Sequence, residues 1–465
     1  MSGPGGPGPL IFGTDGVRDR SGEGFLAVES LEQIVRATAS VLARSADFPE
    51  DFPPGRGSTV LLARDTRGSG GAIAGVLSGA FARFGHAVSD LGVLPTPGVA
   101  WLAASWPEAV FGVMISASHN PAEYNGIKFI APTGAKISPS FEKAVSDAYW
   151  KRASPQPTGG AGRPVDRAAE AHEAYVARLV RAAWRPERLQ GKTVAVDAAN
   201  GATHLVAPEV FERLGMRVRA MGHEPDGRNI NLGCGALHPE KLTALVLESE
   251  AAVGFSFDGD GDRMIPVTAR GTVLDGDHVL YLAGKSFQRS GRLPARTVVA
   301  TVMSNVGLEL ALRKEGIELL RTDVGDRNVY LAMLEKAHPV GGEQSGHIIF
   351  LDDARTGDGV LAALRLLDVL DTDDLDLERE ASAMKRYPQV LKNVRVLEKK
   401  PIESLPALGP ALEAARARLG GEGRILLRYS GTEPLLRVMV EGPDFRITED
   451  LAEALCEAVR QGRDG

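Results

Sequence analysis

Cysteine is the scarcest residue in this 465-residue sequence, which contains only Cys234 and Cys456. Two thiols are too few for a framework of disulfides or for a zinc site built from thiolates. Apolar runs long enough to cross a bilayer are also missing, so we expect no membrane association. Long basic stretches are absent and the net charge is −7 at pH 7, which argues against a nucleic-acid partner.

The amino-terminal segment MSGPGGPGPL lacks the charged start and the apolar stretch of a secretory signal. We therefore expect a cytoplasmic protein. The composition, with 43% hydrophobic and 24% charged residues, is typical of a soluble globular chain. A chain of this length exceeds one ordinary hydrophobic core, so we expect roughly three or four domains.

A strand–helix–strand unit recurs three times along the chain. Each copy opens with an apolar strand that begins Thr-Val, at Thr59, Thr193 and Thr297. A helix-like stretch follows and ends on a glycine, as helices often do, at Gly85, Gly215 and Gly316. A second apolar strand then follows, within 86–92, 216–222 and 317–325. Such crossovers join parallel strands, so we predict three repeated α/β domains with mixed, mostly parallel sheets.

Changes in composition indicate where the domains end. The Pro/Gly-rich stretch 152–164 is typical of a linker, and the acidic stretch 371–380 precedes a change of pattern. The last segment predicts two strands around a polar loop, which indicates a small α+β domain and not a fourth repeat. The predicted domains are 1–158, 165–263, 264–380 and 388–465.

The loop DGDGDR follows an apolar strand and alternates aspartates with glycines. Asp258, Asp260 and Asp262 can turn toward one point, and three carboxylates attract a hard divalent cation such as Mg²⁺. A calcium-binding EF-hand loop would need glycine and glutamate where Arg263 and Ala269 stand, so that alternative fails. A solvated acidic turn is the remaining alternative, although three crowded aspartates repel one another without a cation.

The heptapeptide ISASHNP (115–121) also follows an apolar strand, so its side chains should lie at the carboxyl edge of a sheet. Its two serines are compatible with an ordinary turn or with a nucleophile. Lys128 lies downstream, within reach of the same edge. A hydroxyl beside a cation and a carboxylate metal loop suggests phosphoryl transfer.

Two further loops carry groups suited to a phosphorylated sugar. The stretch RYSGTEPLLR offers arginine forks, hydroxyls and loop amides for a phosphate: Arg428, Ser430, Gly431, Thr432 and Arg437. The stretch GGEQSGH offers Glu343 and Ser345 for sugar hydroxyls and His347 for acid–base work. Taken singly, each stretch is also compatible with a plain polar loop.

Taken together, these motifs resemble the α-D-phosphohexomutase superfamily. The motifs FGTDGVR (12–18), ISASHNP, DGDGDR, GGEQSGH and SGTEP occur in this order, and the resemblance runs from about Leu10 to Gly442. Gln344 and the stretch 225–240 resemble the glucosamine branch of the superfamily. The resemblance implies four domains around a central cleft, the first three of one topology and the last a small α+β domain.

The resemblance also assigns roles to particular residues. It implies that Ser118, directly before His-Asn-Pro, is a phosphoserine that joins the three aspartates in binding one Mg²⁺ per chain. Catalytic roles near the transferring phosphoryl group are implied for Arg18, Lys128, Arg263 and His347. Substrate contacts are implied for His119, Glu343, Ser345, Arg428, Ser430, Gly431, Thr432 and Arg437.

The implied reaction interconverts glucosamine 6-phosphate and glucosamine 1-phosphate through a 1,6-bisphosphate. Glucosamine or glucose 1,6-bisphosphate would serve as activator, and the product would supply UDP-N-acetylglucosamine for the bacterial cell wall. The alternatives are a glucose or mannose phosphate mutase on the same scaffold and an inactive sugar-phosphate sensor. We expect a monomer or a homodimer whose only partner is the small sugar phosphate.

Overall fold

The computed structural model describes residues 8–13, 15–153, 155–160, 162–371, 374–430 and 433–461. The chain divides into two compact units. One comprises Met1–Val302 with Leu320–Glu380, and the other comprises Met303–Leu319 with Ala381–Gly465. None of the helices in these described ranges combines the length and the hydropathy needed to cross a bilayer.

The first sheet has the strand order β1-β5-β4-β2-β3-β6. Its strands are β1 (Val17–Arg20), β2 (Thr59–Arg64), β3 (Val88–Val93), β4 (Ala109–Ile115), β5 (Tyr124–Ile130) and β6 (Val165–Asp166). The helices are α1 (Val28–Leu42), α2 (Gly70–Arg83), α3 (Thr96–Ser105) and α4 (Pro139–Trp150). Strand β2 runs parallel to β3 and β4, whereas β5 runs antiparallel to β4 and β1.

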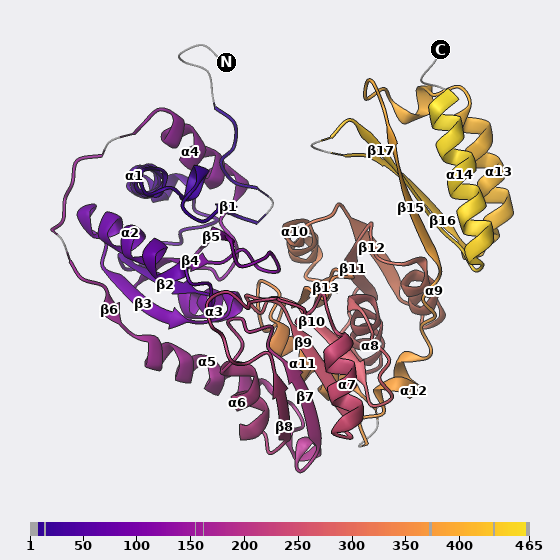
Figure 1. The fold of residues 1–465 in the computed structure, drawn as a ribbon, viewed down its shortest axis with the longest axis horizontal. Coiled ribbons are helices and arrows are strands. Elements are labelled where there is room, and N and C mark those ends of the chain that lie inside the picture. The colour runs from indigo at the N-terminus through magenta and orange to yellow at the C-terminus, as the bar shows by residue number, and fades with distance from the viewer. Residues whose placement is uncertain are drawn as a thin grey trace. The chain divides into compact units, whose positions relative to one another are not determined.

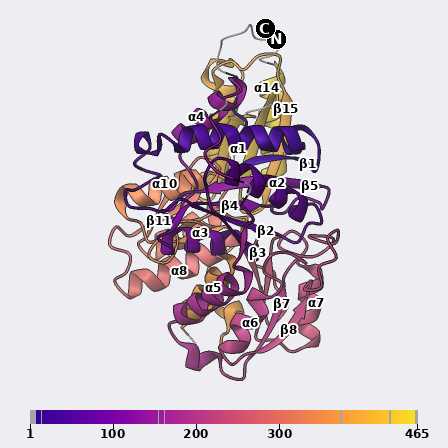
Figure 2. The same ribbon diagram turned by 90° about the vertical axis from the view of Figure 1, so that its left-hand side faces the viewer.

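Helices α1, α2 and α4 share one hydrophobic core with this sheet, and Figure 2 shows α1 and α2 side by side. Phe141 and Val145 of α4 are buried in that core. Helix α3 lies against the other side of β4, where a Cβ on Gly112 would meet Val99 at 2.8 Å. The sheet is therefore covered on both faces, as a largely parallel sheet requires.

The second sheet has the order β10-β9-β7-β8. Its strands are β7 (Thr193–Asp197), β8 (Arg217–Met221), β9 (Val253–Phe257) and β10 (Met264–Thr268), and its helices are α5 (Ala168–Ala182), α6 (Val206–Arg213) and α7 (Glu240–Glu248). Strands β8 and β9 run parallel to β7. Strand β10 pairs antiparallel with β9, so the predicted boundary after residue 263 falls between two paired strands of one sheet.

The third sheet has the order β12-β11-β13-β14. Its strands are β11 (Thr297–Thr301), β12 (Glu318–Thr322), β13 (Val340–Gly342) and β14 (Ile348–Phe350). The helices of this stretch are α8 (Gly276–Arg289), α9 (Val306–Lys314), α10 (Asp326–Lys336), α11 (Gly359–Val369) and α12 (Leu377–Ala381). The strands predicted to open at Thr59, Thr193 and Thr297 all begin at those residues, which confirms the three repeated units.

The last sheet is antiparallel throughout, with β17 (Leu435–Glu441) between β15 (Gln389–Arg395) and β16 (Arg424–Tyr429). Helices α13 (Leu408–Leu419) and α14 (Phe445–Gln461) lie together beside it (Figure 1). The core contains Leu436, Val438 and Val440 of the middle strand. This small α+β domain therefore differs from the three repeats, as predicted.

Candidate active site

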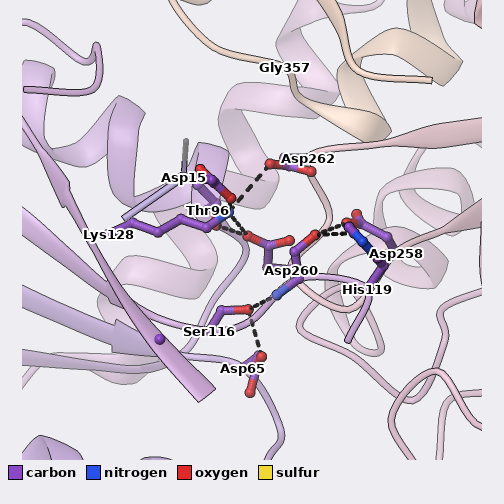
Figure 3. A network of polar contacts seen from close by, with 12 residues as sticks. Asp15, Asp65, Thr96, Ser116, His119, Lys128, Asp258, Asp260, Asp262 and Gly357 are labelled. Atoms are coloured by element: carbon purple, nitrogen blue, oxygen red, sulfur yellow. Dashed lines mark hydrogen bonds and ion pairs between the residues drawn. The ribbon is translucent and has the colours of Figure 1, made fainter. Parts of the chain in front are cut away.

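The loop after β4 separates the roles of its two serines. Ser116 is fully buried, and its Oγ donates a hydrogen bond to Asp65 Oδ2 at 2.6 Å (Figure 3). The same Oγ accepts the backbone N–H of Ser118 at 2.9 Å. Because β2 and β4 are parallel, Asp65 and Ser116 follow their strands at the same edge of the sheet. Ser116 is therefore engaged in shaping the loop.

Ser118 faces the second sheet. Its Oγ donates to Asp258 Oδ2 at 2.7 Å and lies 3.3 Å from His119 Nδ1. Its backbone φ of 53° lies in the left-handed region, which non-glycine residues adopt rarely and often at functional sites. The structure thus holds this hydroxyl against the aspartate loop in a conformation that the surrounding contacts must maintain.

Arg67 maintains that conformation, and sequence reasoning missed it. Its Nε donates to Asp65 Oδ2 at 2.9 Å, and both side chains are fully buried. The guanidinium also donates to four backbone carbonyls of the loop, those of Ser118, Asn120, Pro121 and Tyr124. The sequence shows Arg67 two residues after Asp65 at the end of a strand, but the loop that Arg67 contacts lies about fifty residues further along the chain.

The second sheet also holds the loop. Asn231 Nδ2 donates to the carbonyl oxygens of Ser118 at 2.9 Å and Asn120 at 3.2 Å. A Cβ on Gly259 would lie 2.5 Å from the Ser118 oxygen, so only glycine allows this close approach. Asn231 belongs to the stretch 225–240, which resembles the glucosamine branch. Part of that stretch therefore supports the loop.

Asp258, Asp260 and Asp262 are buried at the carboxyl end of β9, and they offer carboxylate oxygens that all lie within 4.8 Å of one another. Among the described residues, neither Asp260 Oδ1 nor Asp262 Oδ1 has a hydrogen-bond partner, although both atoms are buried. Burial and the neighbouring Asp262 and Asp260 raise the pKa of Asp258 well above its usual range. Buried, crowded and partly unpaired oxygens fit a hard divalent cation.

Lys128 on β5 points into the same cluster (Figure 3). Its Nζ lies 2.7 Å from Asp260 Oδ2, 2.7 Å from Asp15 Oδ2 and 3.6 Å from Asp262 Oδ2. Burial alone would lower the pKa of this ammonium, but Asp15, Asp260 and Asp262 outweigh it and raise the pKa well above its usual range. The predicted lysine therefore lies at the aspartate loop as a cation.

Arg18 and Arg263 also lie at this site. Arg18 on β1 pairs with Asp15, and Arg263 donates its backbone N–H to Asp258 Oδ1 at 3.1 Å. The Arg263 side chain lies 3.9 Å from Asp262, measured from Nε to Oδ1. Burial and these two arginines, Arg263 first, lower the pKa of His119, which keeps this ring uncharged.

His347 precedes β14 and faces the aspartate loop from the third sheet. Its Nδ1 lies 3.6 Å from Asp262 Oδ2, and its Nε2 accepts the backbone N–H of Gly357 at 2.9 Å. Burial would lower the pKa of this imidazole, but Asp262, Asp326 and Glu343 raise it above its usual value. The ring thus lies beside the aspartate loop and can hold or release a proton.

The predicted sugar-binding loop lies between β13 and β14. Glu343 Oε1 accepts the backbone N–H of Gly325 at 3.2 Å. Burial would lower the pKa of Arg263, but Asp262, Asp258 and then Glu343 raise it above its usual value. Ser345 is exposed. Gln344 Nε2 donates to Asp277 Oδ2 at 3.3 Å, so its amide supports the loop.

The predicted phosphate loop belongs to the other compact unit. Arg428 on β16 and Arg437 on β17 are register partners, so two cations face each other across the ladder. Like charges opposite one another are unfavourable, and an anion relieves their repulsion. Ser430 is buried and its Oγ accepts the Glu433 N–H at 3.3 Å. Gly431 and Thr432 lie outside the described residues.

Four domain models of one family match successive parts of the chain. They are the phosphoglucomutase/phosphomannomutase alpha/beta/alpha domains I (9–156), II (173–271) and III (275–387) and the C-terminal domain (391–458). The chain belongs to the phosphoglucomutase/phosphomannomutase family. A curated phosphoglucosamine mutase of Symbiobacterium thermophilum is 43% identical over 97% of this chain and 99% of its own length.

Solved structures share the fold. A phosphoglucomutase/phosphomannomutase family protein from Burkholderia thailandensis superposes with a TM-score of 0.78 at 23% identity, covering 98% of each chain. An Aspergillus fumigatus N-acetylphosphoglucosamine mutase, solved with GlcNAc-6P and magnesium, gives a TM-score of 0.62 at 18% identity, covering 100% of this chain and 97% of that one. At these identities the likeness supports the architecture alone.

Proposed function

We propose that this protein interconverts D-glucosamine 6-phosphate and D-glucosamine 1-phosphate through a phosphoserine at Ser118. The observation that carries the proposal is the 2.7 Å contact between Ser118 Oγ and Asp258 within a buried triad of carboxylates. A hydroxyl in that position can carry a phosphoryl group whose charge a divalent cation balances. The named relatives, phosphoglucosamine mutases at about 42% identity over nearly the full chain, support the same substrate.

Two phosphoryl transfers of opposite direction complete the reaction. In the first, a free sugar hydroxyl loses its proton to a base and attacks the phosphorus of phosphoserine 118. The bond from phosphorus to Ser118 Oγ breaks, and a 1,6-bisphosphate forms. After the bisphosphate turns around, Ser118 Oγ attacks its other phosphate and recovers the phosphoryl group, while a proton returns to the released sugar oxygen. No phosphate is gained or lost.

The residues around Ser118 supply the groups that these transfers need. We assign Asp258, Asp260 and Asp262, with an oxygen of phosphoserine 118, to binding of one Mg²⁺, which supplies neutralising charge at the phosphate. Lys128, Arg18 and Arg263 bring positive charge to the same place. His347 is the proposed proton donor and acceptor, since its imidazole lies beside the aspartate loop.

The remaining predicted residues are assigned to the substrate. We assign His119, Glu343 and Ser345 to contacts with the sugar. We assign Arg428, Ser430 and Arg437, with Gly431 and Thr432, to its distal phosphate, because the facing arginines favour a bound dianion. The proposal includes glucosamine or glucose 1,6-bisphosphate as the activator, which restores phosphoserine when the enzyme has lost its phosphate.

A comparison of kcat/KM for glucosamine, glucose and mannose phosphates tests the substrate. We expect the highest value for the glucosamine phosphates. Equal or higher values for glucose would assign the chain to a different activity on the same scaffold. Intact mass spectrometry should show one phosphate on the purified protein, within the peptide that contains residues 115–121. A phosphate found elsewhere, or Ser118→Ala with wild-type turnover, would contradict the phosphoserine assignment.

A further inference from the structure

Six buried or nearly buried ionisable side chains form a closed ring at the candidate active site. Three carboxylates alternate around it with two lysines and the His347 imidazole, in the order Asp15, Lys128, Asp262, His347, Asp326 and Lys136. Lys128, Asp262 and His347 are the members with assigned roles beside the phosphoryl group. Lys136 and Asp326 are more remote, and neither has a role so far.

The first half of the ring restrains Lys128. Asp15 lies between two lysines: its Oδ2 is 2.7 Å from Lys128 Nζ, and its Oδ1 contacts Lys136 Nζ. Lys136 in turn reaches Asp326 Oδ2 at 2.6 Å. Side chains of Lys136 and Asp326 are only 13% and 15% exposed, so solvent screens these pairs weakly. Without Lys136, the Asp15 carboxylate would lose one of its two lysine partners and could swing away from Lys128.

The second half of the ring restrains His347. Asp326 Oδ2 lies 3.6 Å from His347 Nε2, while Asp262 Oδ2 lies 3.6 Å from Nδ1. The imidazole therefore lies between two carboxylates, and its Nε2 accepts the backbone N–H of Gly357 at 2.9 Å. Asp326 is the first residue of α10, so one short segment links the orientation of His347 to that of Lys136.

We propose that Lys136 and Asp326 are positioning residues for phosphoryl transfer, which keep Lys128 and His347 in their places relative to each other through this ring. The inference rests on the proposed function of the site. Small displacements of charged groups around a transferring phosphoryl group are expensive, because catalysis there depends on placement and electrostatics. The two residues connect the groups across the first and third sheets.

The neighbouring residue of α10 provides a matched control. Arg327 makes a bidentate pair with Glu142 of α4, at 2.6 and 2.8 Å, and donates to the Ile137 carbonyl at 3.1 Å. It therefore joins the same two parts of the chain without belonging to the ring. If Asp326 acted only by joining these two parts of the chain, Arg327→Gln would lower kcat as much as Asp326→Asn does.

The test compares Asp326→Asn, Lys136→Met, their combination and Arg327→Gln in the full-length enzyme. Substitutions of residues that support a metal site typically lower activity 10- to 100-fold, so we expect kcat to fall by roughly that factor in Asp326→Asn and Lys136→Met. KM should stay within about twofold, because neither residue is assigned to the substrate. The double variant should lose little more than either single one, since the pair acts as a unit.

Asp326→Glu supplies the rescue. Lys136 and Asp326 line a cavity of about 180 Å³, which leaves room for one more methylene. We expect this variant to recover most of the kcat lost in Asp326→Asn, whereas Arg327→Gln should lower the melting temperature and keep kcat. Unchanged kcat in Asp326→Asn, or an equal loss in Arg327→Gln, overturns the inference. An inactive wild-type enzyme would instead overturn the proposed function.

Discussion

Ser116 donates its hydroxyl hydrogen to Asp65 at 2.6 Å, and this bond separates two serines that lie two residues apart in the sequence. Ser116 is bonded to the first sheet through Asp65, whereas Ser118 contacts Asp258 beside the second sheet. Ser118→Ala should therefore lower kcat by roughly three to six orders of magnitude, as removal of a covalent nucleophile does. Its circular dichroism and melting temperature should remain close to those of the wild type.

Ser116→Ala is the matched control for that variant. It leaves Asp65 with Arg67 as partner, so we expect a loss of about 1–3 kcal/mol in the free energy of unfolding and substantial remaining activity. Steady-state assays and chemical denaturation of both variants measure the two effects. If both substitutions abolished turnover equally, the nucleophile would remain unassigned.

Removal of divalent cations should abolish activity, and Mg²⁺ should restore it. The three buried aspartates repel one another in the absence of a cation, so the melting temperature should also rise as the Mg²⁺ concentration exceeds its Kd. Asp258→Asn removes one charge and one ligand. This variant should melt no lower than the metal-free wild type and should lose the Mg²⁺-dependent increase. Full activity in excess EDTA would contradict the metal assignment.

Gly259 should not tolerate a side chain. A Cβ there would lie 2.5 Å from the Ser118 carbonyl oxygen and 2.9 Å from Asn231 Nδ2, so Gly259→Ala must displace the loop that presents the hydroxyl. We expect kcat to fall by about 10- to 100-fold, since a shift of about 1 Å at a reacting group has that effect.

The control for this variant is Gly75→Ala within α2. A Cβ at Gly75 meets nothing within 4 Å, and alanine in a helix is favoured over glycine by roughly 1 kcal/mol. Gly75→Ala should therefore keep its activity and melt at the same or a higher temperature. Wild-type kcat in Gly259→Ala would show that the loop does not depend on this close approach.

Cys234 should be unreactive in the folded protein. Burial, with a contribution from Asp197, raises the pKa of its thiol to about 11, whereas a thiol in an unfolded chain ionises near pH 8.5. A folded-state pKa above the unfolded value gives stability that is complete below about pH 8.5 and is lost as the pH rises toward 11. At pH 8 we expect Ellman's reagent to modify Cys234 only after denaturation. In Cys234→Ser, the free energy of unfolding should no longer show the decrease that this thiol causes between about pH 8.5 and 11. Rapid modification of Cys234 in native protein at pH 8 would contradict this picture.

Local patterns in the sequence predicted the repeated α/β units and the different last domain. The strands that begin at Thr59, Thr193 and Thr297 could be predicted, because apolar runs and the turn residues that follow them are local features of the sequence. The aspartate triad was predictable for the same reason, since all of its members lie within five residues. Arg67, Asn231, Lys136 and Asp326 were not predicted, because each acts on a partner far away in the sequence.

The sequence by itself determined which elements form and which polar loops end the strands. The residues alone left two serines as candidate nucleophiles, and the motifs of the family implied Ser118. Only the tertiary structure decided that Ser116 turns toward Asp65 and Ser118 toward Asp258, because that choice depends on the approach of the second sheet to the loop. The ring through Lys136 and Asp326 likewise exists only in three dimensions. Its members come from three parts of the chain, and the pairing of buried charges is set by how those parts pack.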